Sequence, residues 1–133
     1  MAELTHPIQE AERYLNNARN ILSEKAEKDG DYYNDSKYVR MAGNTAWNGV
    51  LLALDAAFDF PKYNKRKKRL DIKDYQNAMA KKDPKMTRPL HSVYETLHLS
   101  LGYDGNTDYK LSRLGLERAQ EMINWASKNY NQN

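Results

Sequence analysis

Apolar residues recur every three or four positions over most of the chain, and this spacing indicates one face of an α-helix. In the last third, for example, Leu111, Leu114, Ala119 and Met122 fall on one stripe. No stretch shows a convincing alternation of apolar and polar residues, which is the pattern of a half-buried strand. We therefore expect four long helices and one short helix, over about residues 7–28, 35–60, 72–82, 87–101 and 108–130.

Local signals mark where these helices begin and end. Pro7 suits the first turn of a helix, and Asp35 and Asp71 can each cap one. Gly30 and Gly102 suit helix ends. Because short connections between long helices favour antiparallel neighbours, the sequence predicts an all-α, up-and-down helical bundle of four long helices plus one short helix.

A length of 133 residues fits a single domain spanning residues 1–133. Its charge is uneven, since residues 61–88 hold eleven Lys or Arg against three Asp, a net of +8, whereas the remainder has a net of −5. We expect a basic connector at about 61–70 and a frayed tail at about 129–133.

The composition excludes several classes of protein. The chain has no cysteine, so it forms no disulfide and no thiolate site. It has no apolar run near the roughly 18 residues that a membrane span needs. The first residues lack the basic-then-apolar layout of a signal peptide. We expect a cytoplasmic protein that does not enter a membrane.

The helix expected at 35–60 is apolar on nearly every side and still carries polar residues. Gly43 and Gly49 each cost it up to about 1 kcal/mol relative to alanine, which indicates that something packs against its backbone. The face opposite its small residues is a row of polar and large apolar side chains: Arg40, Asn44, Trp47, Asn48, Leu51 and Asp55.

Two interpretations of this polar row are open. In the first, the row is a rim, with Arg40 and Asp55 in water and Trp47 half covered by a neighbouring loop. In the second, it lies in a subunit interface or a cleft. Asn44 and Asn48 then need partners, because an unpaired buried amide costs about 1–3 kcal/mol or more. The row is our candidate contact surface.

His91, Glu95 and His98 fall on one helix face, and imidazole beside carboxylate can bind a metal ion. Glu95 and His98 also have the spacing used in di-iron carboxylate bundles. Such bundles need a second pair of this kind on a facing helix, and none of the other expected helices carries one. We therefore expect no metal and no cofactor, and keep these three residues only as a weak candidate beside the alternative of a satisfied polar edge.

The features of common enzymes are also missing. No Gly-x-Ser-x-Gly elbow, phosphate-binding loop or dinucleotide fingerprint occurs in the chain. This disfavours an enzyme.

The strongest charge signal is a run of six cations: Lys62, Lys65, Arg66, Lys67, Lys68 and Arg69. Such a patch can neutralise nucleic-acid phosphates, and Tyr63 within it can stack on a base. The alternative is a solvated connector, because most charge runs are solvated.

The first two expected helices carry a further pattern. Ala11, Leu15 and Ala18 form an Ala-x-x-x-Leu-x-x-Ala motif, and a helix rich in small residues follows at 42–56. Over about residues 7–60 this layout resembles the HEPN-like helical bundles of prokaryotes. The whole chain also looks like a small bacterial family of unknown function.

The HEPN-like resemblance implies a bundle that is often dimeric and that associates with RNA or with a protein partner. HEPN ribonucleases carry an Arg, a polar residue, a few more positions and then a His. Here His91 follows Arg88 too closely and His98 lies too far on. The resemblance therefore implies a non-catalytic member.

These observations predict a non-enzymatic helical interaction module that works as a homodimer or with another protein. RNA binding through residues 62–69 is the alternative, and a metal-dependent enzyme is a third possibility.

Overall fold

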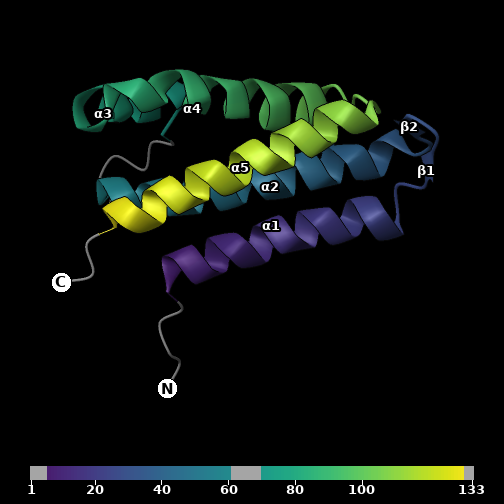
Figure 1. The fold of residues 1–133 in the computed structure, drawn as a ribbon, viewed down its shortest axis with the longest axis horizontal. Helices are drawn as coiled ribbons and strands as arrows, with labels where there is room; N and C mark the ends of the chain where they lie inside the picture. The colour runs from purple at the N-terminus through teal and green to yellow at the C-terminus, as the bar shows by residue number, and fades with distance from the viewer. Residues whose placement is uncertain (1–5, 61–69, 131–133) are drawn as a thin grey trace.

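The computed structural model describes residues 6–60 and 70–130, which are predominantly helical (Figure 1). The α-helices are α1 (Pro7–Glu24), α2 (Ser36–Phe58), α3 (Ile72–Lys82), α4 (Thr87–Val93) and α5 (Tyr109–Asn129). A hairpin of two short strands, β1 (Lys28–Asp29) and β2 (Tyr32–Tyr33), joins α1 to α2. A 3₁₀ turn, η1 (Pro84–Met86), precedes α4, and a π-helix, η2 (Tyr94–Tyr103), continues it.

The predicted helix starts are confirmed by their caps. The side chain of Asp35 accepts a hydrogen bond from the Lys37 amide, and Asp108 caps α5 in the same way. Asp71 and Asp74 form a reciprocal capping box at α3, which satisfies two amides that the helix leaves without partners. These boundaries are local in origin, because a carboxylate before an apolar stretch binds the first free amides of the helix.

The hairpin corrects the expectation of no strand and shortens α1 by four residues. Gly30 has a φ of +63° at the turn, a conformation that favours glycine. The backbone amide of Tyr33 donates to the carbonyl of Thr107 at 2.9 Å, and the amide of Tyr109 donates to the carbonyl of Asp31 at 2.9 Å. These bonds fasten the hairpin to the start of α5. Strands of two residues are too short to show a period in the sequence.

The helices lie side by side, with α2 packed against α1, α5 and η2 (Figure 1). Successive long helices run in opposite directions, which is consistent with the predicted up-and-down arrangement. The long helix expected at 87–101 is a continuous helical run from Thr87 to Tyr103, but its second part is the π-helix η2. Among the fully buried core side chains are Leu15, Leu54, Leu90, Leu97 and Ile123.

Glycines set two close helix contacts, as Gly43 and Gly49 predicted. A Cβ atom on Gly49 would lie 2.8 Å from the Tyr14 Cβ on α1, and one on Gly43 would lie 2.6 Å from the Gly102 amide on η2. The helix α2 therefore packs against α1 at Gly49 and against η2 at Gly43, at distances that only glycine permits.

The expected apolar stripe of α5 is partly wrong. Leu114 is 38% exposed, whereas Ser112 and Gly115 are buried. A Cβ on Gly115 would lie 2.7 Å from the Thr96 methyl group of η2. Because Gly115 packs this closely against η2, α5 turns Ser112 and Gly115 toward the core and leaves Leu114 on the outside.

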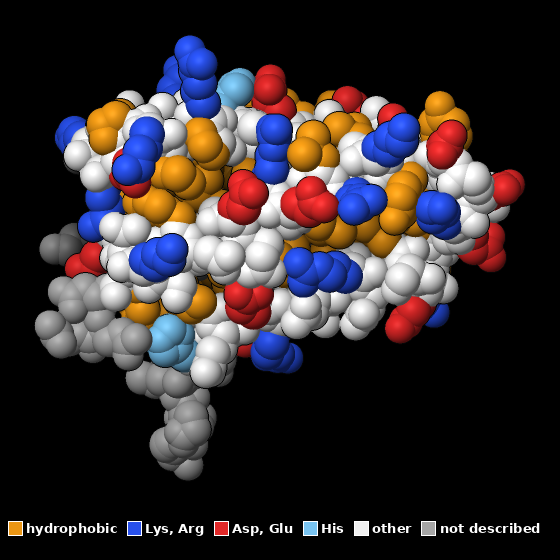
Figure 2. Space-filling model, in the orientation of Figure 1, with side chains coloured by type: hydrophobic (Ala, Val, Ile, Leu, Met, Phe, Trp, Pro, Cys, Tyr) orange, Lys and Arg blue, Asp and Glu red, His pale blue; other side chains and the backbone are white. Residues whose placement is uncertain are grey.

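Acidic and basic side chains are interspersed over the face shown in Figure 2, with hydrophobic side chains visible between them. Within residues 6–60 and 70–130, no helix is both long and apolar enough to span a membrane.

Candidate functional site

Two members of the polar row, Arg40 and Asn44, bind the C-terminal end of η2. Arg40 donates to the carbonyls of Tyr103 and Asp104, each at 3.3 Å, and Asn44 donates to the carbonyl of Gly102 at 3.3 Å. The last carbonyls of a helix lack intrahelical partners and attract positive charge. Arg40 is exposed, as the first interpretation expected, but Arg40 and Asn44 also bind another helix of the same chain, which neither interpretation anticipates.

Trp47 is part of an aromatic cluster with η2. Its side chain is 6% exposed, and its ring centroid lies 5.6 Å from that of Tyr94 and 6.0 Å from that of His98. The expectation that a loop half covers Trp47 is wrong, because a helix covers it almost completely. Trp47 is therefore a residue of the hydrophobic core.

The remaining members of the row lie apart. The Tyr75 hydroxyl donates to Asp55 at 2.6 Å, and burial raises the pKa of the Asp55 carboxyl although this hydrogen bond opposes the shift. Asn48 is exposed and Leu51 is half-buried. The contribution of these two residues to a partner surface stays a prediction.

The weak metal candidate is not assembled. His91 Nε2 lies 3.3 Å from Glu95 Oε2, but the His98 ring stacks with Tyr94 at 5.4 Å instead. Its Nδ1 is buried and has no hydrogen-bond partner among the described residues. A π-helix has more residues per turn than an α-helix, so His98 is rotated away from Glu95. Across the described ranges, no group of three His, Asp or Glu side chains could hold a metal ion.

The nucleic-acid candidates Lys62, Lys65, Arg66, Lys67, Lys68 and Arg69 lie outside the described residues. RNA binding through them stays a prediction.

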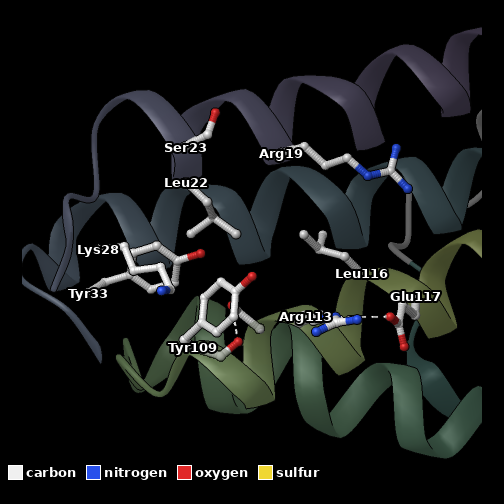
Figure 3. A pocket seen from close by; sticks show the side chains of 10 residues that line it. Arg19, Leu22, Ser23, Lys28, Tyr33, Tyr109, Arg113, Leu116 and Glu117 are labelled. Atoms are coloured by element: carbon white, nitrogen blue, oxygen red, sulfur yellow. Dashed lines mark hydrogen bonds and ion pairs between the residues drawn. The ribbon is translucent and has the colours of Figure 1, made fainter. Parts of the chain in front are cut away.

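A pocket of about 470 Å³ lies between α1, the hairpin and α5 (Figure 3). Each of these three elements supplies part of its wall, and the hairpin closes one end. The pocket is lined by Arg19, Leu22, Ser23, Lys28, Tyr33, Tyr109, Ser112, Arg113, Leu116 and Glu117.

Two buried hydroxyl-bearing side chains belong to this pocket. Tyr33 is 7% exposed and Ser112 is 1% exposed. The Ser112 hydroxyl donates to the carbonyl of Tyr109 at 2.8 Å. Burial raises the pKa of Tyr33, a hydrogen bond with Ser112 opposes this, and the nearby Tyr109 adds to it. Tyr33 is therefore a neutral phenol that can donate a hydrogen bond.

The pocket carries more positive than negative charge. Lys28 Nζ lies 4.4 Å from the centre of the Tyr109 ring, a cation–π contact. Arg113 Nε lies 3.3 Å from the carboxylate of Glu117. Arg19 donates to amide oxygens, that of Asn16 at 2.9 Å and that of Gln120 at 3.1 Å.

None of the pocket residues is in the polar row identified from the sequence. A signal for them does exist on α5, because Tyr109, Ser112 and Leu116 are spaced by three and four residues and so share a helix face. The hairpin that brings Lys28 and Tyr33 to this face is not visible in the sequence pattern.

Comparisons with known proteins give a family but no activity. A solved structure described as a protein of unknown function from Dyadobacter fermentans matches with a TM-score of 0.82 and 43% sequence identity, over 92% of this chain and 93% of that one. Among curated proteins no match is found. A family of unknown function, as the sequence suggested, is confirmed, whereas nothing supports the HEPN-like resemblance. Since the family described as a domain of unknown function (DUF5618) matches residues 6–128, the chain belongs to that family.

Proposed function

We propose that this protein is a non-enzymatic binding module that holds a small organic molecule in the pocket between α1, the hairpin and α5. The observation that carries the proposal is the pocket itself, about 470 Å³ in volume, with Leu22 and Leu116 as apolar walls and the Tyr33 and Ser112 hydroxyls beside them. Small-ligand sites are typically concave spaces of about 300–1,000 Å³, mostly apolar, with a few placed polar groups.

The pocket is also preformed. The hairpin is fastened to the start of α5 by the two backbone hydrogen bonds at Tyr33 and Tyr109. A site held by such bonds loses little conformational freedom when a ligand enters, which favours affinity.

The polar groups of the pocket favour binding over catalysis. The Ser112 hydroxyl already donates its proton to the Tyr109 carbonyl of its own helix. None of the residues that line the pocket is a histidine that could activate this hydroxyl as a nucleophile. The raised pKa of Tyr33 keeps its hydroxyl protonated and poorly nucleophilic. These groups are suited to donate hydrogen bonds to a ligand.

A fragment screen by protein NMR tests this proposal. Ring compounds of low mass are expected to shift the amide resonances of Tyr33, Ser112 and Leu116 together. Leu116→Trp fills the pocket and is expected to abolish these shifts. Leu114→Trp places the same bulk two residues away on the exposed side of α5 and is the matched control. Fragments that bind Leu116→Trp as well as the wild type would refute the proposal.

The predicted homodimer is a second candidate function, favoured by one observation. Among the described residues, four large apolar side chains are exposed. Three of them belong to segments that meet at the hairpin end of the bundle: Tyr32, Met41 and Tyr103. Tyr103 is 77% exposed. If this end is a dimer contact, Tyr103→Asp halves the mass measured by light scattering, whereas Leu114→Asp on α5 leaves it unchanged. A monomeric wild-type protein at high micromolar concentration would exclude the dimer.

A further inference from the structure

The side chains that line the pocket include Arg19, Lys28 and Arg113 against Glu117, a net charge of +2, whereas the hairpin residues that flank Lys28, Glu27, Asp29 and Asp31, are acidic and exposed. Arg113 is neutralised by Glu117. Among residues 6–60 and 70–130, the side-chain ion pairs join Arg13 to Glu10, His91 to Glu95 and Arg113 to Glu117, so no carboxylate lies within 4.0 Å of the Lys28 or Arg19 charge. Arg19 is tied to neutral amide oxygens, which leaves Lys28 as the cation best placed to meet a ligand.

Hydrogen-bond donors lie at the same end as Lys28. Figure 3 shows the Lys28 and Tyr33 side chains beside that of Tyr109, at the hairpin end of the pocket. The centroids of the two tyrosine rings are 5.9 Å apart. A lysine ammonium beside a protonated phenol can bind an anionic group through a charge-assisted hydrogen bond and a second hydrogen bond.

The rest of the pocket suits an apolar body. Leu22 lies beside Tyr33 and Tyr109, whereas Leu116 lies farther along the pocket, near Arg113 (Figure 3). The hairpin end of the pocket therefore carries the Lys28 ammonium and the Tyr33 hydroxyl with Leu22 beside them, and Leu116 adds apolar surface farther along. A ligand that matches both has a charged head and an apolar ring or short chain.

We propose that the pocket binds a small amphiphilic carboxylate, with its carboxylate at Lys28 and Tyr33 and its apolar body against Leu22 and Leu116. This inference rests on the proposed binding function. It goes further by fixing the charge of the ligand and its direction in the pocket. The ammonium of Lys28 moves from the face of the Tyr109 ring onto the carboxylate, and the Tyr33 hydroxyl donates to the second carboxylate oxygen.

Three probes with one ring system and different charges test the inference. They are 2-naphthoate, the neutral 2-naphthamide and the cationic 2-naphthylmethylammonium, titrated by calorimetry or NMR at low salt. We expect 2-naphthoate to bind about tenfold more tightly than the amide and the ammonium to bind most weakly. The difference in affinity between 2-naphthoate and the amide should decrease as salt is added, since ions screen the Lys28 charge.

Two variants locate the charged head. Lys28→Met is expected to lower the affinity for 2-naphthoate to that for the amide and to leave the amide unchanged. Lys110→Met makes the same change in net charge on the exposed side of α5 and is expected to leave both affinities unaltered. Tyr33→Phe should weaken binding of 2-naphthoate and of the amide, whose oxygens both accept from the phenol, and leave that of the ammonium unchanged.

The possible failures are distinguishable. Equal binding of all three probes, lost in Leu116→Trp, would keep the binding function and overturn the carboxylate inference. A carboxylate preference that survives in Lys28→Met would also overturn the inference. Absence of binding by every probe and every fragment would overturn the binding function itself.

Discussion

Replacing Gly43 by alanine tests how tightly α2 and η2 pack. A Cβ at this position would lie 2.6 Å from the amide nitrogen of Gly102 and from the Cβ of Leu101, and 2.7 Å from the carbonyl oxygen of Leu97. Two of these atoms are backbone and the third is bonded to it. None can move aside alone, so the whole of η2 has to shift away from α2.

The cost follows from two opposing terms. Alanine inside a helix is favoured over glycine by up to about 1 kcal/mol. Overpacking a buried site typically costs about 1–3 kcal/mol, and contacts with backbone belong at the upper end. A shift of η2 also lengthens the hydrogen bonds from Arg40 and Asn44, each worth about 0.5–1.5 kcal/mol. We expect a net loss of about 2–3 kcal/mol in the free energy of unfolding.

Thermal and urea unfolding followed by circular dichroism measure this loss. For a chain of this length, the expected decrease in melting temperature is about 6–15 °C. Gly115→Ala is the control, because the atoms nearest to its new Cβ, the Thr96 methyl group at 2.7 Å and Leu97 Cδ2 at 3.1 Å, are side-chain atoms, whereas Gly43 meets backbone. It should lose clearly less stability. A Gly43→Ala protein as stable as the wild type would refute the close packing of α2 against η2.

Three further substitutions have defined outcomes. Asn44→Ala should cost about 1 kcal/mol in denaturant unfolding by removing the hydrogen bond to Gly102, and an unchanged midpoint would contradict this role. Asp55→Asn should unfold at an equal or higher temperature than the wild type at pH 7. Burial raises the pKa of Asp55, so the folded state loses stability as pH rises from the ordinary value of 3.8 through the raised one. The advantage of Asp55→Asn should vanish at pH below both values, and a pH-independent difference would oppose the assignment. Trp125→Phe removes the hydrogen bond from the indole to Asp83, 2.8 Å long, and should lower stability by about 1–3 kcal/mol.

The limits of sequence-based prediction here follow from the range of the interactions involved. The start of α3 was predictable because Asp71 and Asp74 bond to amides of the same helix turn. The π-helical pitch of η2 was not, since the donors on its last carbonyls come from Arg40 and Asn44, about sixty positions earlier in the chain. Periodicity reports which residues are apolar and does not report whether i→i−4 or i→i−5 hydrogen bonds form.

The pocket escaped prediction for a related reason. Lys28 and Tyr33 reach it only through the hairpin, whose strands of two residues leave no period in the sequence. Ser112 is buried although it lies outside the expected apolar stripe, whose Leu114 is exposed instead, and Gly115 of the same face packs against Thr96. A buried serine on the same helix face as the half-buried Tyr109 and Leu116 is a weak signal alone and becomes informative only when the facing element is known.

The polar row of α2 and the pocket are connected through η2. Arg40 and Asn44 fix the C-terminal end of η2, and Thr96 within η2 packs against Gly115 of α5. Gly115 lies between Ser112 and Leu116, so its contact with η2 sets the rotation with which α5 presents these two residues to α1. Arg40 and Asn44, two of the six residues of the polar row, therefore hold the helix against which the α5 wall of the pocket packs.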